Sequence, residues 1–144
     1  MLIKIENGQP QSYSFHQLRK DNPNTSWPKK VTPEVYASYG VYVCKADPFP
    51  AYDQYSQRAV FDAYYQNADS EWRASYKVED LPQEAAAANV RGKRNELLAE
   101  SDWTQVADAP VDQAAWATYR QALRDIPQQP SFPYGITWPT EPTS

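Results

Sequence analysis

The chain has 144 residues, of which 14% are aromatic and 22% charged, and its net charge is −4. The aromatic content argues against a disordered protein, because aromatic side chains supply apolar area for a core. The acidic balance disfavours nucleic-acid binding, which needs clustered Lys and Arg, and the length suits one core or two small modules.

The N-terminal residues predict short strands and helices. Residues 2–5 (LIKI) fit a strand, and the Asn-Gly pair after them is a turn signal. Residues 15–20 fit one or two helical turns, which end at the sequence DNPN because the residue before proline avoids the helical region. Thr32 is a cap candidate, and the proline after it opens a short helix over residues 33–39.

Three segments beyond residue 40 predict further strands. Residues 41–44 (VYVC) are β-branched, aromatic or small and apolar. Residues 71–78 alternate polar with apolar side chains, which is the period of a strand. Residues 57–65 are also compatible with a helix, but their composition favours a strand, and the polar run at 66–70 has the length of a hairpin loop. Residues 1–80 therefore predict a small α+β module with a mostly antiparallel sheet.

The last third of the chain predicts two helices around a sharp turn. The first starts near residues 80–82 and is rich in Ala, Leu, Glu, Arg and Lys up to Glu100. Gly92 interrupts it, which indicates either a close backbone approach or a slight bend. The second lies between Asp112 and Pro127. Its apolar residues step by three, four and three, which places them on one stripe: Trp116, Tyr119, Leu123 and Ile126.

Residues 81–144 therefore predict an αα-hairpin followed by an extended aromatic and proline-rich tail, and the predicted fold class is α+β. One hairpin buries little area alone, so we expect it to dock on the N-terminal half, on a second copy or on a partner. The tail at residues 132–139 either clamps the hairpin or lies along a partner's sheet edge, and its composition favours the clamp.

The sequence offers little for catalysis. With one histidine and one cysteine, neither a Cys/His zinc cluster nor a two-histidine site can form within the chain. Cys44 is interpreted as an inert buried thiol, and His16 as a surface or capping residue. Asp102 and Asp108 flank the inter-helix turn, where carboxylates usually accept backbone hydrogen bonds rather than act as a catalytic pair. We predict no catalytic, cofactor or metal site, and no enzyme.

The five tryptophans and eleven tyrosines suit a sugar-stacking platform, a protein-binding hot spot or a core. The helical spacing of Trp116, Tyr119 and Leu123 favours the core. Arg120 and the arginine one turn later lie near the carbonyl end of their helix, where positive charge is favourable. The basic run at residues 91–94 is interpreted as a solvated helix face.

Three motifs stand out in the last third: RNELLAESDWTQVADAPVD, WATYRQALRDI and FPYGITWP. Together they resemble the C-terminal signature of the tail fibre assembly and tail assembly chaperone-like proteins of tailed bacteriophages. Upstream, LRKDNPNTSWP and VYVCKADPFPAYDQYSQ resemble the N-terminal module of many such phage proteins.

This resemblance implies a non-enzymatic phage tail protein, which binds tail fibre or other tail polypeptides as an assembly chaperone in the host cytoplasm. The alternative is a structural adaptor that stays on the fibre or baseplate of the virion, and a third class is a carbohydrate-binding accessory. No cofactor, nucleic acid or membrane is expected, and self-association is compatible with the pattern. The candidate partner-binding or docking residues are Arg94, Asn95, Asp102, Trp103, Trp116, Tyr119, Arg120, Arg124, Phe132 and Trp138.

Overall fold

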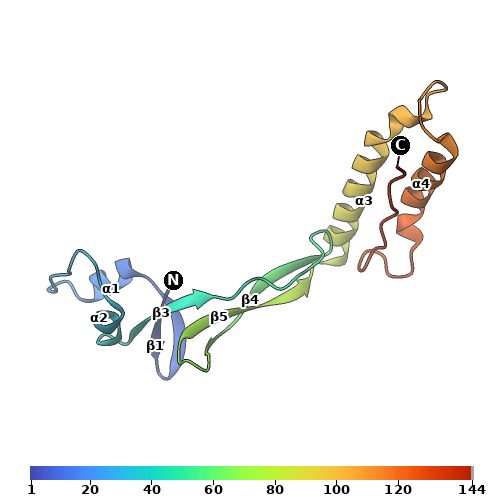
Figure 1. The fold of residues 1–144 in the computed structure, drawn as a ribbon. Helices are drawn as coiled ribbons and strands as arrows, with labels where there is room; N and C mark the ends of the chain where they lie inside the picture. Colours follow the sequence, from blue (N-terminus) through green and yellow to red (C-terminus); the bar gives the residue numbers. More distant parts are fainter. Residues whose placement is uncertain (144) are drawn as a thin grey trace. The chain divides into compact units, whose positions relative to one another are not determined.

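The computed structural model describes residues 1–143, which adopt a mixed α+β fold (Figure 1). The strands are β1 (Leu2–Glu6), β2 (Gln9–Tyr13), β3 (Val41–Ala46), β4 (Gln57–Gln66) and β5 (Trp72–Asp80). The helices are α1 (Phe15–Asp21), α2 (Pro33–Ala37), α3 (Gln83–Glu100) and α4 (Gln113–Asp125), with 3₁₀ turns η1 (Asp102–Gln105) and η2 (Ile126–Gln128). The predicted fold class, with a mostly antiparallel sheet and a C-terminal helix pair, is confirmed.

The chain forms two compact units. Unit 1 comprises residues 1–50 and 59–77, and unit 2 comprises residues 51–58 together with residue 78 onward. Unit 2 thus takes in a segment, 51–58, that precedes the two long strands β4 and β5. The division of the chain into modules at 1–80 and 81–144 remains a prediction.

The sheet has the strand order β2-β1-β3-β5-β4. Strand β1 pairs antiparallel with β2 and with β3, whereas β3 and β5 run parallel, with Cys44 opposite Trp72. The residues between β4 and β5 are too few for a crossover, so these strands form a hairpin. The strand interpretation of residues 57–65 is therefore correct, and the helical alternative is wrong.

Strand β2 was missed by the sequence analysis, because QPQSY lacks the alternation of a half-buried strand. The turn before it explains why it forms. Asn7 and Gly8 both have positive φ, 51° and 76°, the conformation of a tight hairpin turn that returns the chain along β1. Its place at the edge of the sheet explains how it tolerates Pro10.

Unit 1 has a small core and two short helices, α1 and α2. Ile3, Cys44 and Ala74 form its buried cluster. The Ser14 side chain accepts a hydrogen bond from the Gln17 backbone N–H and so caps α1. Helix α2 begins at Pro33 as predicted, but the side chain of its N-cap, Thr32, makes no capping hydrogen bond.

Unit 2 is built on α3 and α4 (Figure 1). Helix α3 continues through Gly92, where an added Cβ would meet no atom within 4 Å, so the close backbone approach considered for Gly92 is excluded. The Asp112 side chain caps α4 by accepting from the backbone N–H groups of Ala114 and Ala115. The predicted apolar stripe is buried, and with one α3 residue it forms the core of the unit: Val90, Trp116, Tyr119, Leu123 and Ile126.

The C-terminal tail packs on its own unit, which agrees with the clamp interpretation (Figure 1). Phe132, Ile136 and Trp138 are partly buried against the core cluster. The Tyr134 hydroxyl donates to the Leu81 carbonyl oxygen at 2.7 Å, which ties the tail to the start of the helical segment. Within the described residues, no helix is both long enough and apolar enough to cross a membrane.

Candidate partner-binding surface

The turn between α3 and α4 exposes two large apolar side chains. Trp103, in η1, and Val106, directly after it, are each 53% exposed. Such side chains are usually buried in a folded protein, and Trp is enriched at the energetic centre of protein interfaces. We call residues 102–106 the hairpin tip.

Arg120 holds the hairpin tip in place from inside the unit. Its Nη1 donates to the Leu98 carbonyl oxygen at 2.6 Å and to Ser101 Oγ at 2.8 Å. Its Nη2 donates to Asp102 Oδ1 at 2.7 Å. The fork geometry of a guanidinium suits such convergent acceptors, and one arginine therefore joins α4 to the end of α3 and the start of η1.

The tip is also fixed by Thr104, whose side chain is fully buried and donates to the Ser101 carbonyl oxygen at 2.7 Å. Trp103 rests against Trp116, with the ring centroids 6.2 Å apart, and Trp116 meets Tyr119 edge to face at 5.6 Å. One part of the Trp103 ring is thus packed while the rest faces solvent. An aromatic side chain held in this way is preorganised for binding, since little conformational freedom remains to be lost.

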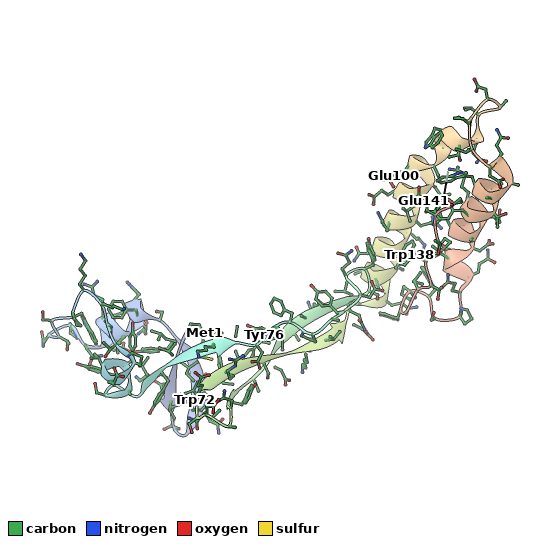
Figure 2. All side chains as sticks on the ribbon, in the orientation of Figure 1. Met1, Trp72, Tyr76, Glu100, Trp138 and Glu141 are labelled. Carbon is green, nitrogen blue, oxygen red and sulfur yellow. The ribbon has the colours of Figure 1, made fainter. Side chains whose placement is uncertain are left out.

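A small cavity of about 30 Å³ lies beside this aromatic group. Its lining includes Glu100 of α3 and Glu141 of the tail, both labelled in Figure 2. Burial raises the pKa of the Tyr119 phenol, and the charges of the same two carboxylates raise it further. The Trp116 Nε1 is buried and has no hydrogen-bond partner among the described residues.

The candidate residues occupy three kinds of position. Trp116, Tyr119 and Arg120 are buried, with 5–7% of their surface exposed, and their contacts lie within unit 2. Asp102 and Trp103 lie at the hairpin tip, and the Asp102 side chain is 68% exposed. Asp102 accepts from Arg120 rather than from the backbone, which corrects the expectation for a turn carboxylate.

The remaining candidates lie away from the tip. Arg94 donates to the Asn95 side chain at 2.8 Å on the surface of α3, about two helical turns before the tip. Arg124 is exposed at the end of α4. The tail residues are partly buried, with Phe132 under the Arg91 guanidinium and Trp138 beside Tyr55, 5.7 Å between ring centroids. The structure therefore joins five of the candidates into one group and leaves the others apart from it: Asp102, Trp103, Trp116, Tyr119 and Arg120.

Sequence reasoning passed over Val106. Its signal was present, because a valine in the polar run between two predicted helices has no helical stripe to join. Cys44 agrees with its prediction of a buried thiol, and burial raises the pKa of that thiol. Within residues 1–143, no three His, Cys, Asp or Glu side chains are grouped so that they could hold a metal ion.

Comparison with known proteins finds a match, and it covers the part of the chain that contains the hairpin tip. No curated protein and no solved structure matches the chain. The model of the family described as phage tail assembly chaperone protein matches residues 87–143, which include most of α3, the hairpin tip, α4 and the tail. The resemblance of the C-terminal motifs to this family is thereby confirmed: residues 87–143 match the family described as phage tail assembly chaperone protein.

Proposed function

We propose that this protein is a non-enzymatic assembly chaperone of a bacteriophage tail, and that it binds a tail fibre or other tail polypeptide through the hairpin tip. The observation that carries the proposal is the half-exposed Trp103 on a braced turn within the segment that matches the family. Binding takes place in the host cytoplasm while the tail polypeptide still exposes apolar strands or helices, which a chaperone covers before assembly.

The size of the tip favours a transient contact over a permanent one. Trp103 and Val106 are the two large apolar side chains exposed there, and Asp102 adds a carboxylate beside them. Permanent interfaces are larger and more apolar, whereas reversible ones are small and mixed. This supports the chaperone over the alternative of a structural adaptor that stays on the fibre or baseplate.

Quantitative mass spectrometry of purified phage particles distinguishes the two roles. A chaperone is expected in infected-cell lysate, bound to a tail polypeptide, and absent from mature particles. Recovery of this chain from particles in a fixed ratio to the fibre or baseplate protein would establish the adaptor and overturn the chaperone.

Co-purification of the tail polypeptide with variants of this chain tests the hairpin tip. Trp103→Ala is expected to weaken the complex about tenfold or more, because an interface tryptophan contributes roughly 2 kcal/mol. Tyr52→Ala removes a similarly exposed aromatic side chain, 45% against 53%, outside the matched segment, and is expected to bind like the wild type. Equal binding by the two variants would remove the tip from the interface.

Arg120 needs a separate control, because it is buried behind the tip. Arg120 is buried and does not itself contact the partner, so we expect Arg120→Ala to weaken binding only indirectly, through the loss of the hydrogen bonds that hold the turn. Arg124→Ala removes an exposed arginine from the same helix and is expected to leave binding unchanged. If Arg124→Ala abolishes co-purification in a folded protein, the interface extends along α4 rather than ending at the tip.

A further inference from the structure

Unit 1 contains a basic pocket that the proposed chaperone surface does not use. A cavity of about 430 Å³ lies between α1 and the loop that follows it. Its charged lining consists of Arg19 and Lys20 from the last turn of α1, and His16 lies one turn earlier. The residues that line this cavity include no Asp or Glu. Its volume falls within the range of ligand pockets, about 300–1,000 Å³.

The basic side chains of this pocket lack ion-pair partners among the described residues. Salt bridges bind most basic residues elsewhere in unit 1, including Lys4, Lys45 and Arg73, whereas neither Arg19 nor Lys20 has one. The sequence neighbour Asp21 has both carboxylate oxygens occupied, since the Tyr13 hydroxyl donates to one and the Gln17 side chain to the other. These hydrogen bonds leave the Asp21 carboxylate charged, and the Lys20 ammonium is among the groups that lower its pKa. The positive charge of the hollow is therefore offset in part beside Lys20, whereas Arg19 has no ion pair among the described residues.

One wall of the pocket is apolar. Trp27 lines it and is held edge to face against Phe15, with the ring centroids 5.6 Å apart, and by a second ring contact with Tyr39 at 5.1 Å. Pro23 and Thr25 complete the same loop. A ligand that fits must present an anionic group to the arginine and lysine and a methylene or apolar surface to the indole. A glutamate side chain in a polypeptide has both features, whereas free phosphate lacks the apolar part.

From this arrangement we infer that the pocket of His16, Arg19, Lys20 and Trp27 is a docking site for a carboxylate-bearing, extended segment of a protein partner. A nucleic acid is disfavoured as the occupant, because two cationic side chains beside one indole do not form the longer run of Lys and Arg that a phosphate backbone requires. The pocket lies outside residues 87–143 and does not depend on the proposed function of the hairpin tip.

The test titrates an acetylated, amidated hexaglutamate peptide into the full chain at about 20 mM salt, where charges are little screened. The Trp27 indole N–H resonance and titration calorimetry report binding. Arg19→Ala/Lys20→Ala is expected to weaken binding about tenfold or more. Lys29→Ala/Lys30→Ala removes the same charge from exposed residues of the same unit that do not line the cavity, and is expected to change affinity less than about threefold.

Four outcomes overturn the inference. Equal loss of affinity in the two double variants would mean diffuse attraction without a site. An indole shift of the same size with inorganic phosphate would mean a general anion site. No change in the Trp27 resonance would place the peptide elsewhere. Self-association of the wild type that Arg19→Ala/Lys20→Ala abolishes would make a second copy of this chain the occupant.

Discussion

Unit 1 and unit 2 are stabilised in different ways. In unit 1 the buried cluster is small, and the polar surface carries ion pairs such as the one between Asp47 and Arg73, 2.6 Å apart. In unit 2 a larger apolar cluster is joined to the turn by the buried Arg120. Hydrogen bonds between backbones hold the strands of a sheet together. Two helices satisfy their backbone groups internally, so only side-chain packing fixes how one helix lies against the other.

The two units also differ in charge. Unit 1 carries eight Lys or Arg and seven Asp or Glu, whereas unit 2 carries six and eleven, so the excess negative charge of the chain belongs to unit 2. The basic pocket lies in unit 1, and the exposed apolar tip lies in unit 2. Both units expose large apolar side chains, such as Phe49 in unit 1 and Trp103 in unit 2, so it is the charge balance that distinguishes the two surfaces.

The largest effect is expected from the core of unit 2. Leu123 is fully buried, so Leu123→Ala should cost about 3 kcal/mol through lost transfer energy and the cavity left behind. Amide hydrogen exchange should show the loss in α3 and α4, while amides of the β1–β3 pairs keep their protection. Exposed Gln121→Ala is the control and should change stability by less than about 0.5 kcal/mol. Equal loss of protection in both units would mean that they unfold together.

A smaller effect is expected at the brace of the hairpin tip. Arg120→Ala should destabilise unit 2 by about 2 kcal/mol, because the Leu98 carbonyl oxygen and Ser101 Oγ lose a charged donor. Arg120→Lys should recover only part of this, since an ammonium cannot reproduce the fork. Denaturant unfolding followed by tryptophan fluorescence measures both. A stability of Arg120→Ala equal to that of Arg124→Ala would contradict the brace.

The smallest effect concerns acid stability in unit 1. The Arg73 guanidinium beside Asp47, and then the Tyr65 hydroxyl, hold the pKa of that carboxyl below its ordinary value. The lowered pKa contributes stability that is present above the unfolded pKa, about 3.9, and is lost as pH falls through the folded pKa.

Asp47→Asn should therefore flatten the acid dependence of unit 1 below about pH 4, measured by NMR of the β3 and β5 amides. Asp69→Asn, in the exposed β4–β5 loop, is the matched change and should leave the curve as in the wild type. An unchanged acid limb in Asp47→Asn would assign the acid sensitivity to other carboxyls.

The local sequence was sufficient to predict most of the helices and strands, and to find the resemblance to the phage family. The stripe of α4 and the alternation of β5 are periodic over enough residues to specify their type, and Pro127 and Asp112 set the ends of one helix. The motifs that resemble the phage family lie where the family model matches. Strand β2 lacked such a pattern, because an edge strand made by a turn needs no apolar face.

The candidate site depended on tertiary structure. Sequence placed Arg120 and Trp103 in one group of candidates, since both lie in the motifs, but could not separate an inward from an outward side chain. The packing of α3 against α4 buries Arg120 behind the turn and leaves Trp103 half exposed. The sequence pattern alone specifies the type of each periodic element and the resemblance of residues 87–143 to the phage family. Which residues face solvent was decided by the contacts between elements, because exposure depends on what packs against a side chain and not on its identity.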